Sequence, residues 1–310
     1  MNLEILDCTL RDGGYTNNWQ FNQEFIISTI NSLINSQVKN IECGYLTDIV
    51  EITNFNPQGT KLNFIDNFNT LLSNIDKKDS IFYIMIDFNT FDISNLTSKN
   101  NSLIDGIRLA FHKKDLKSIS QYAKMIKSKG YKLFIQPMAI HLYSDSEIND
   151  LILLSEDIKP DSLYIVDSFG VLDYFDLKEY FLKLNSSLDK SISIGLHLHN
   201  NIDTAFSNSI NILKEYKNFE RNIIIDSSIS GIGRGAGNIK TEFLLLYLNK
   251  KFNLYKPEYI LSLIDSNDFF NNDIIKKDIA YFISGINKIH PSKILKSLDN
   301  NSLESIYLTE

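Results

Sequence analysis

The sequence is poor in cysteine, proline and tryptophan, with 2, 5 and 1 of them among 310 residues. The two cysteines, Cys8 and Cys43, are too few for a disulfide framework and fit a reducing compartment, so we expect a cytoplasmic protein. Long apolar runs are also absent, since no stretch approaches the ~18 residues that span a bilayer. The first residues, MNLEILDCTLRDGG, contain neither a charged leader nor a sustained apolar segment. We therefore expect neither a signal peptide nor a membrane partner.

An excess of positive charge is lacking too. The chain has 31 Lys and Arg against 38 Asp and Glu, which gives a formal net charge of −7. Proteins that bind nucleic acid present clustered positive charge to the phosphates, and here the lysines are dispersed. We therefore do not expect a nucleic-acid partner.

The informative pattern is an alternation of short apolar runs with longer segments of helical period. Runs that are apolar on successive positions are typical of parallel strands covered on both faces. Eight short apolar runs lie at 3–7, 38–44, 80–87, 105–111, 132–139, 162–167, 191–199 and 222–229, and several of them are apolar on successive positions. The segments between them predict helices at 21–36, 60–75, 90–98, 114–129, 144–158, 173–188 and 202–217.

Eight strand-then-helix units over ~250 residues match a (β/α)₈ TIM barrel in size and order. The competing α/β fold, an open doubly wound sheet, usually carries a G-x-G-x-x-G turn after its first strand. The turn here reads TLRDGGYTNN and lacks that spacing. We therefore predict an α/β protein with a TIM barrel over residues 1–250 and a small helical C-terminal extension over residues 251–310, where no strand is expected.

The segment GLHLHNN (195–201) is the sharpest local feature. Residues two apart in a strand point to the same side, so His197 and His199 can aim at one point in the barrel mouth. Two imidazoles so placed are natural ligands for a divalent transition metal. An isolated H-x-H pair is more often two histidines bonded to nearby carboxylates, but its position on the seventh strand favours the metal.

Two imidazoles need at least one carboxylate to complete a metal site. The candidates at the ends of strands are Asp7, Asp12, Glu42, Asp87 and Asp167. The turn that contains Asp12 also offers Arg11 and a Gly13–Gly14 pair, which allows the backbone to approach a ligand closely. Taken alone, such a turn is more often a solvated charge pair.

The third segment, SISGIGRGAGN (228–238), follows the eighth strand with four glycines that alternate with other residues. It leads into a helix predicted to begin near Ile239, and free N–H groups at a helix N-terminus favour an anion. Gly235 could therefore contribute to binding a substrate acid group, and Asn238 could offer its carbonyl to the metal. A loop that serves only tight packing explains the glycines equally well.

Together, DCTLRDGGY, GLHLHNN and GIGRGAGN resemble the motifs of the DRE-TIM (HMGL-like) metallolyases. This superfamily includes 4-hydroxy-2-oxoacid aldolases, hydroxymethylglutaryl-CoA lyase, and the isopropylmalate and citramalate synthases. The resemblance covers residues 3–250 and is closest to the 4-hydroxy-2-oxovalerate type of pyruvate aldolase. It implies a divalent metal cofactor, Mn²⁺ or Mg²⁺ first and Co²⁺ or Zn²⁺ as alternatives.

The resemblance also assigns roles to residues at the matching motif positions. It makes Asp12, His197 and His199 the metal ligands, with Asn238 as a further ligand. Arg11 corresponds to the arginine that stabilises enolate charge and binds substrate.

Two further motifs extend the resemblance to the ketoacid aldolases. RLAFH resembles their R-x-A-T-H and places Arg108 and His112 in the mouth, as a substrate-binding and a catalytic residue. DSFG (167–170) resembles their D-S-x-G, whose serine lies beside bound pyruvate, so Ser168 is expected to bind substrate.

The chain departs from those aldolases at Tyr15, where they carry a histidine with a proton-transfer role. A tyrosine with an ordinary pKa of ~10 can donate a proton but is a poor base at neutral pH. The base is left open among metal-bound hydroxide, His112, Tyr281 and His290. The C-terminal extension is too short for the synthases' regulatory domain, and resembles a reduced form of the domain that aldolases use to dock a dehydrogenase.

These features predict a lyase: a divalent-metal-dependent, class II aldolase that makes or breaks a C–C bond between pyruvate enolate and an aldehyde. We expect a homo-oligomer, with a dehydrogenase as a further candidate partner. The first alternative is a Claisen-type acyl transferase that condenses acetyl-CoA with a 2-oxoacid. The second is a non-catalytic barrel that binds a partner protein.

Overall fold

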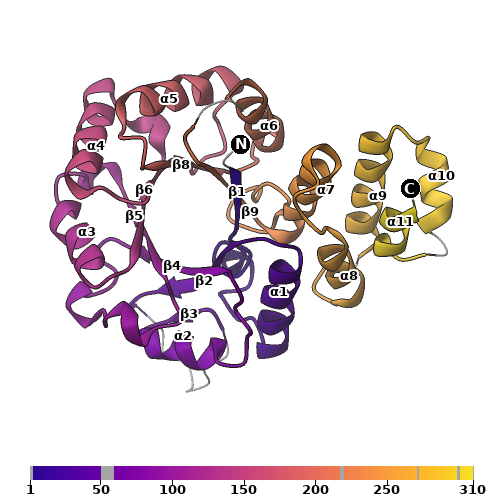
Figure 1. The fold of residues 1–310 in the computed structure, drawn as a ribbon, viewed down its shortest axis with the longest axis horizontal. Coiled ribbons are helices and arrows are strands. Elements are labelled where there is room, and N and C mark those ends of the chain that lie inside the picture. Colours follow the sequence, from indigo (N-terminus) through magenta and orange to yellow (C-terminus); the bar gives the residue numbers. More distant parts are fainter. Residues whose placement is uncertain (1–2, 50–58, 217–219, 271, 299–300, 310) are drawn as a thin grey trace.

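The computed structural model describes residues 3–49, 59–216, 220–270, 272–298 and 301–309. Parallel strands close into a barrel because β1 pairs with β9 on one side and with β2 on the other (Figure 1). A two-residue strand, β3 (Lys61–Leu62), adds to the end of β2. The eight barrel strands are β1 (Leu3–Asp7), β2 (Asn40–Leu46), β4 (Ile81–Asp87), β5 (Gly106–Phe111), β6 (Lys132–Pro137), β7 (Ser162–Asp167), β8 (Ser193–Leu198) and β9 (Ile223–Ser227).

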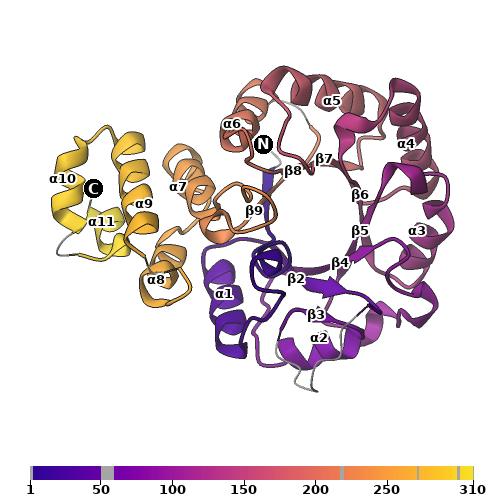
Figure 2. The same cartoon turned by 180° about the vertical axis from the view of Figure 1, so that it is seen from behind.

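The predicted TIM barrel is therefore confirmed, and each of the eight predicted strands is present. β3 was not predicted, because two residues are too few to display an apolar pattern. Helices surround the barrel, as Figures 1 and 2 show from opposite sides. They are α1 (Gln23–Asn35), α2 (Ile65–Leu72), α3 (Ile119–Ser128), α4 (Asp145–Ile158), α5 (Tyr174–Ser187), α6 (Ala205–Tyr216) and α7 (Thr241–Phe252).

Several helix ends follow from the local sequence. Ser144 and Glu147 form a capping box at the start of α4, in which each side chain accepts the other residue's backbone N–H. Beyond the end of α3, Gly130 adopts a φ of +90°, a left-handed conformation that glycine takes without strain. The predicted helix over 202–217 begins at Ala205, and its predicted last residue lies outside the described residues.

The prediction of a helix over 90–98 is wrong. This segment forms a short 3₁₀ turn, Ile93–Asn95, in which the Asp92 carboxylate accepts the Ser94 backbone N–H. Asp, Ser and Asn side chains compete with helical hydrogen bonds by bonding to nearby backbone groups. The two buried apolar anchors, Phe91 and Leu96, are also five residues apart, which is not the spacing of one helix face.

The C-terminal residues form helices that pack on one side of the barrel (Figures 1 and 2). They are α8 (Glu258–Ser266), α9 (Asp273–Asn287), α10 (Pro291–Leu298) and α11 (Leu303–Thr309). No strand follows β9 in the described part of the chain, and no described helix is long and apolar enough to cross a membrane. α8 packs on α1 and α9 packs on α7, while the domain boundary at residue 250 stays a prediction.

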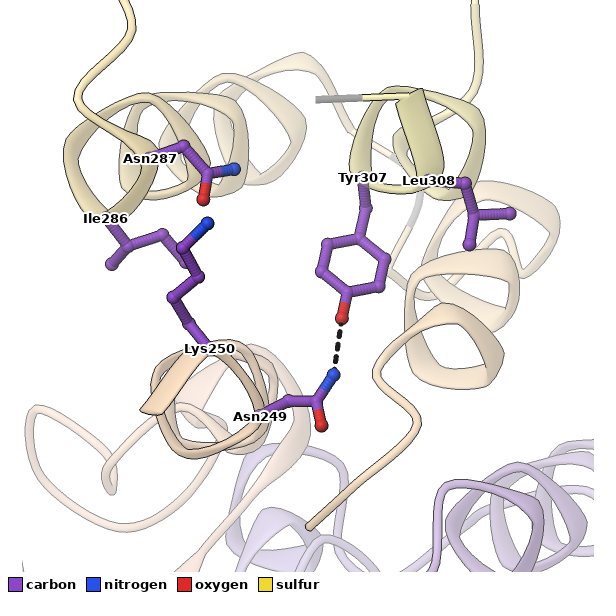
Figure 3. Close-up of a pocket in the computed structure, with 6 residues that line it drawn as sticks. All are labelled: Asn249, Lys250, Ile286, Asn287, Tyr307 and Leu308. Carbon is purple, nitrogen blue, oxygen red and sulfur yellow. Dashed lines mark hydrogen bonds between the residues drawn. The ribbon is translucent and has the colours of Figure 1, made fainter. Parts of the chain in front are cut away.

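A cavity of about 380 Å³ lies between α7, α9 and α11 (Figure 3). The Asn249 side chain on α7 donates a hydrogen bond of 2.7 Å to the Tyr307 hydroxyl on α11. Lys250 and Asn287 extend toward each other from α7 and α9 in the same view. The extension is thus tied to the last barrel helix by polar as well as apolar contacts.

The barrel interior is filled in layers. Tyr83, Phe134 and Tyr164 belong to an apolar cluster inside the barrel. Nearer the C-terminal ends of the strands, Met85 and Ala110 pack together in a second cluster. A packed interior leaves the C-terminal mouth as the place where side chains can meet a ligand, which is where TIM-barrel enzymes carry their active sites.

Candidate metal centre

Three buried side chains converge at the mouth of the barrel. Asp12 comes from the loop after β1, His197 from β8, and His199 from the position just after β8. One ligand atom of each lies within 4.8 Å of the others. Their residues are 1%, 4% and 5% exposed, so all three groups are withdrawn from bulk water. The structure thus brings together the three side chains that the sequence suggested as metal ligands.

Each of the two imidazoles is oriented by a bond to its Nδ1 atom. His197 Nδ1 lies 2.8 Å from Asp226 Oδ2, and His199 Nδ1 lies 3.3 Å from the backbone oxygen of Gly237. These contacts leave Nε2 of each ring as the atom available to a metal, an arrangement typical of ligating histidines. Burial, together with the neighbouring His197, lowers the pKa of His199 to about 4, so its ring is neutral at pH 7, as a ligand must be.

Asn238 supplies a test of whether these residues fit a metal. Its Nδ2 donates to Asp12 Oδ2 at 2.6 Å, while its buried Oδ1 has no hydrogen-bond partner within the described structure. An unpaired buried acceptor costs on the order of 1–3 kcal/mol, so a partner is expected. A carboxylate, two imidazoles and an amide oxygen form a donor set that suits a divalent ion such as Mn²⁺ or Zn²⁺. The residues present fit the group.

Arg11 is held beside this cluster by two carboxylates. Its Nε donates to Glu42 Oε2 at 2.8 Å and its Nη1 to Asp12, and the residue is 4% exposed. Burial alone would lower the pKa of Arg11, but Asp12 and Glu42 raise it well above the ordinary value. The buried Nη2 has no partner among the described residues. A fixed positive charge with unused donors therefore stands next to the candidate ligand Asp12.

Arg108 lies below the mouth, inside the barrel, with no exposed surface. Its Nη1 donates to Glu42 Oε2 at 2.6 Å, its Nη2 to Asp226, and its guanidinium carbon lies 4.9 Å from the centre of the Tyr164 ring. The sequence predicts that Arg108 lies in the mouth. Its contacts show that it positions the carboxylates of Glu42 and Asp226. Its expected contact with substrate stays a prediction.

Tyr15 lies in the 3₁₀ turn Gly13–Thr16 and is 43% exposed. Its ring contacts that of Trp19, with centroids 4.7 Å apart, and the Arg234 guanidinium lies 5.7 Å from its centre. Desolvation raises the pKa of the Tyr15 phenol above its ordinary value, although Arg11 opposes the rise. The phenol is thus protonated at neutral pH, consistent with a proton donor and not with a base.

The remaining sequence candidates occupy the rim of the barrel. The Ser168 Oγ accepts the Ala139 N–H at 2.9 Å, which links the loops after β7 and β6. His112 is exposed, directly after β5. Gly235 has a φ of +63°, and a Cβ there would lie 2.9 Å from the Asn201 side chain, so only glycine fits this position without strain. The roles expected for these residues stay predictions.

Two alternative bases, Tyr281 and His290, belong to the C-terminal extension. Tyr281 is part of α9, and His290, just before α10, pairs with Ser292. Both α9 and α10 lie outside α7, beyond the ring of barrel helices (Figure 1). Nothing in this arrangement directs either side chain toward the candidate metal centre.

The glycine-rich loop is anchored to α7 by a buried acid. The Glu242 carboxylate accepts the Ser230 N–H at 3.0 Å, and its other oxygen has no partner in the described part of the chain. Two more loop N–H groups donate to Asp12 and Asn201. Three loop N–H groups are thus taken by the protein's own side chains, and an anion would have to bind the remaining loop N–H groups.

Glu242→Gln is expected to remove a pH dependence of stability. Burial raises the pKa of Glu242 to about 7 in the folded protein, against 4.5 for an ordinary glutamate. Because the folded state retains the proton longer, this group's contribution is full below pH ~4.5 and is lost as the pH rises through about 7. The loss amounts to about 3 kcal/mol. Urea unfolding at pH 5 and pH 8 checks this: the wild type should lose more stability than the variant, and equal losses would contradict it.

Asp226→Asn is expected to weaken metal binding by about 10–100-fold. Asp226 orients His197 through the 2.8 Å contact to Nδ1, and an amide in its place no longer favours the ring tautomer that exposes Nε2. Titration of the metal-free variant with Mn²⁺ measures the effect, and a denaturation curve shows whether the variant is folded. An unchanged Mn²⁺ affinity in a folded variant would rule out this positioning role.

Comparisons with known proteins show which sequences and folds the chain is similar to. A sequence model described as HMGL-like matches residues 108–266. The chain is 24% identical over 251 residues, 81% of its length and 71% of the relative, to the oxaloacetate decarboxylase of Mycobacterium tuberculosis. It is 26% identical over 252 residues, 79% of its length and 69% of the relative, to the 4-hydroxy-2-oxovalerate aldolase of Geobacillus thermodenitrificans. The fold of the chain is also similar to that of the N-terminal domain of a Bacteroides vulgatus protein, with a TM-score of 0.68 at 24% identity, over 96% of this chain and 97% of that one.

Proposed function

The chain belongs to the HMGL-like family and is a lyase of the metal-dependent kind, and on that premise we propose that it catalyses a reversible aldol reaction between pyruvate and an aldehyde. The substrate in the cleavage direction is a 4-hydroxy-2-oxoacid. Several relatives are named 4-hydroxy-2-oxovalerate aldolases, and the proposal assigns the activity in that name to the present chain.

One observation carries the proposal: the convergence of Asp12, His197 and His199 within 4.8 Å at the barrel mouth. With the Asn238 oxygen, these residues would hold a divalent ion, Mn²⁺ or Mg²⁺ first. Such an ion supplies Lewis acidity for the oxygen atoms of a 2-oxoacid. The reaction requires this chemistry, because cleaving the bond between the α and β carbons of a ketone leaves an enolate.

Arg11 provides the charge that such an enolate requires. Its guanidinium is fixed by Asp12 and Glu42, and its unpartnered Nη2 can donate to a substrate oxygen. A preorganised donor of this kind is worth about 3–4 kcal/mol of transition-state stabilisation. Because the group is already in place, no energy is spent on orienting it during the reaction.

Residues on the neighbouring loops complete the proposed substrate site. The Ser168 Oγ already accepts the Ala139 N–H, so its own proton is available for the pyruvate carboxylate. Gly235 belongs to the glycine-rich loop after β9, and its backbone N–H is proposed to bind the same acid group. Tyr15, protonated at neutral pH, is a proton donor toward the enolate carbon.

A spectrophotometric assay tests the proposal. The purified chain, freed of metal and reloaded with Mn²⁺, is incubated with 4-hydroxy-2-oxopentanoate, and pyruvate is detected by coupling to lactate dehydrogenase. We expect pyruvate and acetaldehyde in equal amounts, and loss of activity on chelation. A parallel incubation with acetyl-CoA and pyruvate tests the Claisen alternative, in which free thiol would appear instead. No product in either assay would favour the non-catalytic barrel.

Oxaloacetate decarboxylation is a second candidate, because one of the reported relatives carries that name. It would release carbon dioxide in place of an aldehyde and leave the same pyruvate enolate, so the same residues would serve. Oxaloacetate in the assay above distinguishes the two: the ratio of kcat/KM for the two substrates identifies the preferred one.

We further propose that the chain forms a homo-oligomer, and that a dehydrogenase is the partner that would consume the aldehyde. The helical extension, α8 to α11, is the element that would carry such contacts. Light scattering of the full chain measures its oligomeric state, and a monomer at micromolar concentration would contradict the proposed homo-oligomer.

A further inference from the structure

The mouth contains one more carboxylate that the proposed mechanism has not used. Asp87 is the last residue of β4 and pairs in register with Ala110 on β5. Side chains two apart on a strand share a face, and Tyr83 and Met85 both belong to apolar clusters inside the barrel. Asp87 therefore faces the barrel axis at the level of the mouth, above Met85.

The surroundings of Asp87 combine a hydrogen-bond donor with positive charge. The Tyr45 phenol from β2 is its hydrogen-bond partner. Basic side chains from three other segments act to lower the pKa of the carboxylate: Arg11 from the loop after β1, His112 after β5 and Arg234 from the glycine-rich loop. Asp87 thus stands among groups from several sides of the mouth, as a residue that contacts a centrally bound ligand would.

Burial sets the protonation behaviour of this carboxylate. Desolvation raises the pKa of Asp87 above its ordinary value, and the Tyr45 hydrogen bond and the charge of Arg11 only partly offset that rise. A carboxylate with a raised pKa is a stronger base than an ordinary aspartate and is better suited to proton transfer. The candidates for the general base that the sequence suggests are metal-bound hydroxide, His112, Tyr281 and His290, and Asp87 is not among them.

We propose that Asp87 is the general base of the cleavage reaction and the general acid of the reverse reaction. This inference rests on the proposed aldol function. In cleavage, the Asp87 carboxylate takes the proton of the 4-hydroxyl group. The electron pair of that O–H bond forms the carbonyl of the aldehyde, the C3–C4 bond breaks, and its electron pair becomes the C2–C3 double bond of pyruvate enolate. Tyr15 then supplies the proton to C3 and regains one from water, so that pyruvate and the aldehyde leave and Asp87 returns its proton to water.

The test compares Asp87→Asn with the wild type, both loaded with Mn²⁺ and shown to contain equal metal. We expect the variant to lose about 10²–10⁴-fold in kcat for cleavage at pH 7. The wild-type kcat should rise with pH through the pKa of Asp87, and the variant should lack this acidic limb. Asp92→Asn is the matched control, because Asp92 follows the same strand, is exposed, and its carboxylate accepts the Ser94 N–H and hydroxyl. Its kcat should stay within about threefold of the wild type.

Tyr45→Phe adds a readout that a merely structural role of Asp87 would not move. Removing the phenol takes away a hydrogen bond that lowers the pKa of Asp87, so the acidic limb should shift to higher pH. The groups that face Asp87 and whose charges must be considered are Tyr45, Tyr15, Lys61, Arg11, His112 and Arg234. The Tyr45→Phe variant removes only the Tyr45 hydroxyl, and the other groups near Asp87 are the same as in the wild type.

The outcomes separate this inference from the function on which it rests. A wild type that cleaves no 4-hydroxy-2-oxoacid overturns both. A wild type that cleaves them, alongside an Asp87→Asn variant of equal kcat and unchanged acidic limb, overturns the role of Asp87 alone. A large loss of kcat together with the loss of the limb supports it.

Discussion

Arg11→Lys will keep its metal and lose most of its turnover, with kcat about 10²–10³-fold below that of the wild type. The arginine bonds to Glu42 through Nε and to Asp12 through Nη1, and still has Nη2 to offer a substrate oxygen. A lysine keeps the charge but has a single nitrogen, so it cannot satisfy both carboxylates and the substrate from one fixed position. Asp12 and the two imidazoles are unchanged, so metal affinity should hold. Metal content and kcat for cleavage of 4-hydroxy-2-oxopentanoate, measured on one preparation, check both parts.

Arg221→Lys is the matched control for this prediction. Arg221 is also buried, but it donates to four backbone oxygens at the end of α5 and in the turn that follows, among them those of Leu188 and Ile192. The same replacement there should lower thermal stability and leave kcat unchanged below the melting temperature. If Arg11→Lys turned over at the wild-type rate, the proposed stabilisation of enolate charge by Arg11 would be wrong.

Asp12→Ala and His197→Ala will each abolish tight metal binding and, with it, activity. Each substitution removes one of three converging groups and leaves the others as neutral or singly charged donors that hold a divalent ion weakly. Dialysis of each variant against Mn²⁺ followed by elemental analysis measures the loss, with about one ion per chain expected for the wild type and close to none for the variants. Activity should not be restored by raising Mn²⁺ to the concentration that saturates the wild type.

His141→Ala is the control for those two variants. His141 lies in the 3₁₀ turn after β6, against the Phe169 ring, and no candidate ligand contacts it. Its loss should leave the metal content unchanged. A His197→Ala variant that still held one ion per chain would show that the ion binds elsewhere.

Much of the fold could be predicted from the sequence because parallel strands covered on both faces have a simple sequence pattern. Most barrel strands are rich in Ile, Val, Leu or Phe and end at or just before a polar residue, as in the segment that ends at Asp87. This pattern does not predict β3, because β3 is only two residues long and is defined by its pairing with β2. It also overestimated the segment 90–98, where Asp92 bonds to the local backbone and no helix forms.

The candidate site was predictable where its residues are close in sequence and less so where they are not. His197 and His199 lie two apart, which alone implies a shared direction. The partner of His197, Asp226, comes from a different strand, and only the register of β8 with β9 brings the two together. No local pattern shows that Arg108 connects Asp226 to Glu42 beneath the mouth.

A register shift explains why the role of Asp87 was not apparent. On β2 the pairing with β4 shifts between Glu42 and Tyr45, so the simple alternation of inward and outward residues is interrupted there. Alternation from Glu42 would direct Gly44 inward and Tyr45 outward, whereas Tyr45 packs with Met85 and reaches Asp87. An irregularity of this kind depends on the neighbouring strand, which a single sequence does not describe.

The central claim is that one divalent ion binds jointly to Asp12 in the loop after β1 and to His197 and His199, in and just after β8. A crystal of the Mn²⁺-loaded protein, measured for anomalous scattering at the manganese edge, tests it most directly. The account predicts a single strong peak within bonding distance of Asp12, His197 and His199, with the Asn238 oxygen turned toward it. A peak at another place, or no peak in crystals of protein that carries one equivalent of manganese, would contradict it.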